Sequence, residues 1–114
     1  PGYLTRLTAE AHDTVTRVGY PNLGIQFDFH NAQLMEGSLT RALEETIGSI
    51  KHMQIAGLPG RTPPDEGEMN YPYLFGVIDR LGYEGWIGHE YRPHGDDDGA
   101  TKESLRWAAE FGLG

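Results

Sequence analysis

Three polar side chains stand near the ends of three strand-like runs of this sequence. Asp28 lies in GIQFDFH, Gln54 in HMQIAG and Glu90 in WIGHEY. Helix-like segments separate the runs, and parallel strands joined by helices bring their carboxyl ends to one edge of the sheet. Two carboxylates and an amide oxygen are donors that suit a hard divalent cation. The spacing therefore allows the three side chains to meet at one cation-binding point.

Each of these residues also has a structural explanation. An unpaired buried carboxylate is costly, so it must be paired, metal-bound or solvent-facing at a strand end. For Asp28 and Glu90 the alternative is a salt bridge to a loop arginine, and we favour the functional interpretation. For Gln54 the two interpretations are balanced, because buried amides often bond only to the backbone.

Four histidines are further candidate metal ligands. We expect structural or surface roles for His52, His89 and His94. His30 stays open, because an extended run would place it on the same face as Asp28 at the strand end.

The segment GLPGRTPPDEGEMN is polar, rich in Gly and Pro, and long for a connection, which is typical of a functional loop. Its Arg61 could clamp an anionic substrate through the planar guanidinium, although a solvated arginine is equally consistent. Glu68 precedes a predicted helix, where stabilisation by the helix dipole is a sufficient explanation.

The composition excludes several classes of function. The chain has 114 residues, no cysteine and a formal net charge of −8. Disulfides, thiolate catalysis and zinc–sulfur sites are therefore excluded, and the charge argues against nucleic-acid binding. No apolar run is long enough to span a membrane, and we expect a cytoplasmic protein. The sequence starts at Pro1 without Met, which we interpret as a fragment or a processed product.

Hydrophobic periodicity predicts helices and strands in alternation. We expect Thr8, Ser38 and Thr101 to cap three of the helices. Alternation of this kind predicts an α/β fold with a parallel sheet, and three strands look like part of a (β/α)8 barrel, which carries its chemistry at the carboxyl ends of its strands. The predicted helices cover residues 8–19, 38–50, 71–81 and about 101–111, and the strands 23–29, 52–56 and 86–91.

Three segments carry a family resemblance. They are IQFDFHNAQLMEG, HMQIAGLPGR and DEGEMNYPYLFGVIDRLGYEGWIGHEYRP. Together they resemble the C-terminal half of hydroxypyruvate isomerases, which are xylose-isomerase-like TIM barrels. The resemblance implies that residues 1–114 form one unit, from the fifth to the eighth helix of the barrel.

The resemblance also implies a ligand set. Asp28, Gln54 and Glu90 would bind Mg²⁺ or Mn²⁺, and a fourth ligand, a Glu on the fifth strand, would precede Pro1. That Glu and Glu90 would form the catalytic acid–base pair.

Substrate contacts are implied as well. Arg61 and Glu68 match the family's substrate-binding loop. The family usually has His three residues after the metal-binding Asp; here that position is Asn31, and His30 precedes it. Either His30 or Asn31 therefore takes this substrate contact.

The implied activity is the interconversion of hydroxypyruvate and tartronate semialdehyde through an enediolate, on a small hydroxy-oxo acid and with neither nucleic acid nor membrane as partner. One alternative is a related sugar epimerase or oxo-tetronate isomerase. Another is an inactive half-barrel that requires self-association into a homo-oligomer or a missing N-terminal half.

Overall fold

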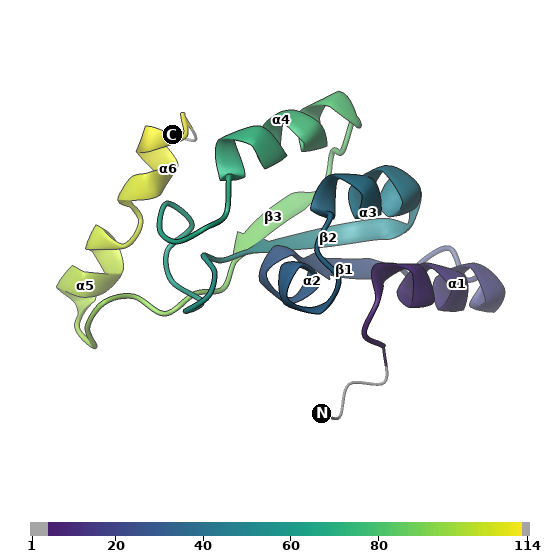
Figure 1. The fold of residues 1–114 in the computed structure, drawn as a ribbon, viewed down its shortest axis with the longest axis horizontal. Helices are drawn as coiled ribbons and strands as arrows, with labels where there is room; N and C mark the ends of the chain where they lie inside the picture. The colour runs from purple at the N-terminus through teal and green to yellow at the C-terminus, as the bar shows by residue number, and fades with distance from the viewer. Residues whose placement is uncertain (1–4, 113–114) are drawn as a thin grey trace.

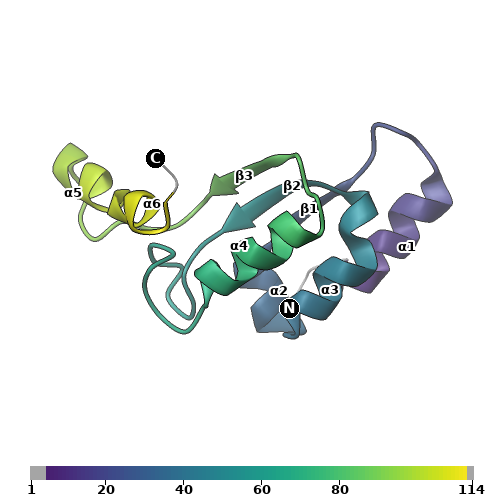
Figure 2. The ribbon, with the colours of Figure 1, turned by 90° about the horizontal axis from the view of Figure 1, so that it is seen from above.

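A computed structural model describes residues 5–112 of the chain. A three-stranded sheet carries helices on one side, as Figures 1 and 2 show. Along the chain the elements are α1 (Thr8–Val18), β1 (Ile25–Asp28), α2 (Phe29–Met35), α3 (Leu39–Thr46), the 3₁₀ turn η1 (Ile47–Ser49), β2 (Ile50–Ile55), α4 (Tyr71–Arg80), β3 (Trp86–His89), α5 (Asp98–Glu103) and α6 (Arg106–Glu110).

The strands lie in the order β1–β2–β3, and both neighbouring pairs are parallel. Asp28 pairs with Gln54, which in turn pairs with Gly88 of β3. The carboxyl ends of all three strands therefore share one edge of the sheet, and the predicted parallel α/β fold is confirmed.

The two faces of the sheet differ in character. Phe27, Met53 and Ile55 are buried on the face that α2, α3 and α4 cover. Side chains alternate between the two faces along a strand, so the neighbours of these residues in each strand point to the opposite, uncovered face. There Trp86 is 84% exposed. The other side chains on the uncovered face are Gln26, Asp28, His52 and Gln54.

The predicted strand 23–29 was too long, because a helix begins directly after β1. Asp28 is the N-cap of α2, and its side chain accepts a hydrogen bond from the Asn31 backbone N–H. A capping carboxylate satisfies one of the free N–H groups of a helix start. His30 and Asn31 consequently lie in the first turn of α2. This corrects the expectation that His30 shares an extended strand face with Asp28.

Two of the three predicted helix caps are wrong, and the third is right in position only. Thr8 is the first residue of α1 rather than its cap, and the Glu10 side chain accepts hydrogen bonds from backbone N–H groups at this helix start. Ser38 precedes α3 as expected, but it has φ 50° and makes no capping hydrogen bond. Asp97 caps α5, so Thr101 is inside a helix.

Two predicted helices are shorter in the structure. The segment 38–50 is helical only to Thr46, whose hydroxyl bonds back to the Ala42 carbonyl; a 3₁₀ turn follows, and Ile50 already belongs to β2. The segment 101–111 is divided into α5 and α6. The helix α4 agrees well with the prediction and is capped by the side chain of Asn70.

Candidate functional site

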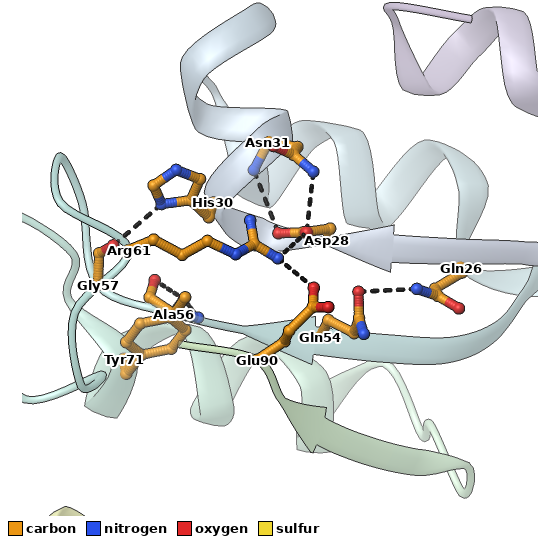
Figure 3. Close-up of polar contacts among 10 residues, drawn as sticks. All are labelled: Gln26, Asp28, His30, Asn31, Gln54, Ala56, Gly57, Arg61, Tyr71 and Glu90. Carbon is orange, nitrogen blue, oxygen red and sulfur yellow. Dashed lines mark hydrogen bonds and ion pairs between the residues drawn. The ribbon is translucent and has the colours of Figure 1, made fainter. Parts of the chain in front are cut away.

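Side chains from the carboxyl ends of the strands surround one pocket of about 620 Å³. Asp28 and Gln54 are direct neighbours across β1 and β2, and Glu90 follows β3 with its N–H bonded to the Ile55 carbonyl at 3.1 Å. The spacing in the sequence allows these three side chains to meet, and the structure brings them together (Figure 3). The pocket is lined by Gln26, Asp28, His30, Asn31, Gln54, Arg61 and Glu90.

Arg61 joins the two carboxylates of the pocket. Its Nη2 donates to Asp28 Oδ2 at 2.8 Å and also to Glu90 Oε2. Partial burial by itself lowers the pKa of Arg61, but the hydrogen bonds and charges of Asp28 and Glu90 outweigh burial and raise it. The guanidinium is therefore a fixed positive charge between two negative ones (Figure 3).

Asn31 holds the Asp28 carboxylate from the other side. Its Nδ2 donates to Asp28 Oδ2 at 2.9 Å, and its backbone N–H donates to Oδ1 at 3.2 Å. The side chain of Asp28 is only 12% exposed, and the bonds from Asn31 and Arg61 satisfy it. The helix start thus fixes the orientation of this carboxylate at the strand end.

The donor set of the pocket fits a hard cation. Asp28, Gln54 and Glu90 offer carboxylate and amide oxygens, which are the ligands that Mg²⁺ and Mn²⁺ prefer. The carboxylate pair already holds one positive group, the Arg61 guanidinium. Residues 5–112 contain no cluster of three or more His, Asp or Glu side chains arranged to hold a metal. The third oxygen donor of this pocket is the amide of Gln54. Three protein oxygens leave coordination positions for substrate, water or further ligands.

Gln26 also reaches the pocket, and the sequence interpretation missed it. Its Nε2 donates to Gln54 Oε1 at 2.7 Å. Gln26 precedes Asp28 by two residues, and alternation along a strand puts the two side chains on the same face. That period could have identified Gln26 from the sequence.

His30 lines the pocket but also has a structural bond. It is 6% exposed, and its Nδ1 lies 2.9 Å from the Gly57 carbonyl oxygen. The bond links the first turn of α2 to the start of the loop that follows β2. Its Nε2 makes no hydrogen bond with the rest of residues 5–112.

Tyr71 fixes the end of β2, a role that nothing in the sequence pattern indicated beyond its aromatic type. Its hydroxyl accepts from the Ala56 N–H at 3.0 Å and donates to the Ala56 carbonyl at 2.7 Å. Burial raises the pKa of Tyr71 well above its ordinary value. The hydroxyl therefore stays protonated and keeps both bonds to Ala56, which follows Gln54 by two residues.

The segment after β3 holds the loop that carries Arg61. The Arg92 N–H donates to the Arg61 carbonyl at 2.8 Å, and His94 Nε2 lies 2.8 Å from Glu66 Oε2. Glu68, predicted to contact substrate, is not among the pocket residues: it is exposed and lines a separate hollow with Asn70.

The other two candidate histidines, His52 and His89, are not among the residues that line the pocket. His89 packs against Trp107 with ring centroids 5.9 Å apart. His52 lies beside Gly88, where an added Cβ would stand 3.0 Å from His52 Nε2. Neither lines the pocket, and structural roles were expected for both.

The family model described as "Xylose isomerase-like TIM barrel" matches residues 1–111. The 2-oxo-tetronate isomerase of Cupriavidus necator is 46% identical over 111 residues, which cover 97% of this chain and 41% of the relative. The hydroxypyruvate isomerase of Escherichia coli is 42% identical over 107 residues, or 94% of this chain and 40% of the relative. The chain thus spans about two fifths of the length of these relatives.

The fold is also similar to a solved structure. The family 2 AP endonuclease of Brucella melitensis superposes with a TM-score of 0.88 at 47% identity, over 96% of this chain and 41% of the other. Among the described residues, no helix has the length and hydrophobicity needed to cross a lipid bilayer.

Proposed function

Because the chain belongs to the xylose isomerase-like TIM barrel family, we propose that residues 1–114 form the C-terminal part of a barrel that isomerises a small hydroxy-oxo acid. The observation that carries this proposal is the convergence of Asp28, Gln54 and Glu90 on one pocket beside Arg61. Relatives named as sugar-acid isomerases support the class of reaction.

The proposed reaction interconverts hydroxypyruvate and tartronate semialdehyde. One proton leaves the hydroxyl-bearing carbon and one is returned to the neighbouring carbon, while the hydroxyl proton passes to the former carbonyl oxygen. Bound Mg²⁺ or Mn²⁺, held by Asp28, Gln54 and Glu90, would supply Lewis-acid polarisation of the two substrate oxygens.

Glu90 is the candidate for one of the two proton transfers. Its side chain is 63% exposed in the pocket, and Arg61 is its ion-pair partner. A positioned carboxylate can take a proton from carbon, and a second carboxylate can return one to the neighbouring carbon. We propose that this second group is a Glu on a strand outside the chain.

Arg61 is suited to bind the substrate carboxylate. Both of its observed bonds use Nη2, and within residues 5–112 its Nε and Nη1 have no partner. An arginine fork can bind a carboxylate with two parallel hydrogen bonds. Nε and Nη1 point in different directions, so each can donate one hydrogen bond to an anionic substrate at the edge of the carboxylate pair. A parallel pair of bonds also needs Nη2, once it has left one of the two carboxylates.

A second substrate has its own support. Relatives named 2-oxo-tetronate isomerase reach 46% and 44% identity, against 42% for the hydroxypyruvate isomerase. This substrate shares the carboxylate and the neighbouring oxo group, so the same residues would act on it. Turnover of hydroxypyruvate and of 2-oxo-tetronate by one preparation decides between them.

The test of the proposed role is Glu90→Gln in the full-length polypeptide that carries this chain. We expect kcat to fall by roughly 10²–10⁴-fold, the usual contribution of general acid–base catalysis. Glu103→Gln is the matched control, because Glu103 is exposed and paired with Arg106 far from the pocket. Unchanged turnover in Glu90→Gln would contradict the proposal.

A further inference from the structure

Gln26 has no role in the proposed reaction, yet it bonds directly to a proposed metal ligand. It lies on the uncovered face of the sheet, where it pairs with His52 of β2. Asp28 and Gln54 are the next pair on this face toward the carboxyl ends of the strands. The Nε2 of Gln26 donates to Gln54 Oε1 at 2.7 Å. Figure 3 shows the two amides facing each other, joined by this bond.

Gln54 needs such a partner more than the two carboxylates do. A carboxylate presents oxygen whichever way it turns, whereas an amide that flips presents an N–H₂ group, which repels a cation. Asp28 and Glu90 are held by Arg61 and Asn31. Within residues 5–112, Gln26 is the side chain that hydrogen-bonds to Gln54.

In the observed bond Gln26 donates and the Gln54 oxygen accepts, which is the orientation in which that oxygen is useful to a cation. A carbonyl oxygen has two lone pairs, so Gln54 Oε1 can accept from Gln26 and still bind a cation. In Figure 3 this oxygen lies on the side of Asp28 and the amide nitrogen is turned away from it. On β3 the position level with Gln54 is Gly88, which has no side chain to compete for the amide.

We propose that Gln26 is a positioning residue that holds the amide oxygen of Gln54 toward the bound cation. The inference rests on the proposed metal site but not on the identity of the substrate. Partners that orient metal ligands in this way typically change metal affinity about 10–100-fold when they are removed.

The test measures the Kd of Mn²⁺ by calorimetry on the full-length polypeptide, without substrate. Gln26→Met removes the donor and keeps the length of the side chain, and we expect the Kd to rise about tenfold or more. Gln33→Met is the matched control, since Gln33 lies on α2 and lines a different hollow. Thermal unfolding without metal verifies that both variants fold.

A double-mutant cycle separates positioning from a general structural effect. If Gln26 acts through Gln54, then Gln26→Met changes the Kd less than about twofold when Gln54 is already replaced by Ala. The inference would be overturned if Gln26→Met raised the Kd equally with Gln54 present and with Gln54 replaced, or if it did not raise the Kd when Gln54 is present. Neither result would contradict the proposed metal site. Absence of Mn²⁺ binding by the unaltered protein would overturn the inference together with the proposed site.

Discussion

At the scale of single residues, Arg61 has the contacts with the strongest consequence for metal binding. Its guanidinium bonds to both Asp28 and Glu90, the same carboxylates that we propose as metal ligands. A divalent cation and the guanidinium therefore compete for the same oxygens. Metal binding should release Nη2 from at least one of them and leave Arg61 free for the substrate.

Arg61→Met should consequently tighten Mn²⁺ binding while it weakens substrate binding. Removing one positive charge next to the cation should make the free energy of Mn²⁺ binding more favourable by on the order of 1 kcal/mol, which lowers the Kd about fivefold. KM should rise at the same time, because the carboxylate clamp is lost. Calorimetry and steady-state kinetics measure the two effects separately.

Arg92→Met is the matched control for this prediction. Arg92 is exposed, and its backbone bonds to the carbonyl of Arg61, so the variant removes a charge nearby without touching the carboxylates. If both variants change the Mn²⁺ Kd equally, the effect comes from overall charge, and the proposed competition between Mn²⁺ and the Arg61 guanidinium is contradicted.

The sequence revealed some of these residues better than others. Asp28, Gln54 and Glu90 were identifiable because each lies at or just beyond the end of a strand-like run. A salt bridge to a loop arginine was the structural alternative for Asp28 and Glu90, and Arg61 forms it with both, but its geometry was not predictable because it depends on a loop in which Arg61 has φ 54°. Such a backbone conformation is rare for residues other than glycine, and sequence pattern does not predict it for arginine.

At the scale of elements, the loop between β2 and α4 holds Arg61 in place. Residues on both sides of the loop approach closely: the Gly57 N–H bonds to the Thr62 carbonyl at 2.7 Å, and the Glu68 N–H bonds to the Leu58 carbonyl at 3.0 Å. Pro64 at its centre is fully buried. The loop is therefore a packed unit rather than a free connection.

Gly67 is the position where this packing is least tolerant. It has φ 86°, and a Cβ there would lie 2.0 Å from the Leu58 carbonyl oxygen. We expect Gly67→Ala to reduce the free energy of unfolding by about 1–3 kcal/mol more than backbone strain alone, because the loop must open. Denaturant unfolding measures this difference.

Gly82→Ala is the control, since Gly82 has φ 68° but a Cβ added there would meet no heavy atom within 4 Å. Both variants place alanine in the left-handed region, which costs about 1–2 kcal/mol. Equal destabilisation of the two variants would contradict the prediction, because the contact between the new Cβ and the Leu58 carbonyl would then be relieved without loss of stability.

Element boundaries were less predictable than element order. The predicted helices and strands follow one another in the predicted order, because hydrophobic periodicity indicates which face each element buries, but α2 was not predicted. The boundaries moved where side chains bond to the backbone: Asp28 starts α2 directly after β1, and Asp97 starts α5 ahead of the predicted Thr101. Polar side chains of this kind compete with continued strand or helix.

At the scale of the whole molecule, the sheet has one covered face and one open face. Trp86 is 84% exposed on the open face, and within residues 5–112 the outer edges of β1 and β3 have no strand partner. A barrel of this family closes with eight strands, which would cover this face and pair both edges. We propose that the rest of such a barrel supplies the other strands and the second carboxylate.

Residues 1–114 expressed alone should accordingly bind Mn²⁺ weakly and show no isomerase turnover. Open strand edges also favour self-association. Mass-based sizing, Mn²⁺ titration and the hydroxypyruvate assay on the isolated chain test this. Measurable turnover by a monomer of this chain would contradict the need for further strands.

The most direct test of the central claim is anomalous diffraction at the manganese edge, from crystals of the full-length polypeptide grown with Mn²⁺. We predict one strong peak within coordination distance of oxygens of Asp28, Gln54 and Glu90, with the Arg61 guanidinium displaced from at least one carboxylate. A pocket without a peak, in which Arg61 still bridges Asp28 and Glu90 while Mn²⁺ is bound elsewhere, would contradict it.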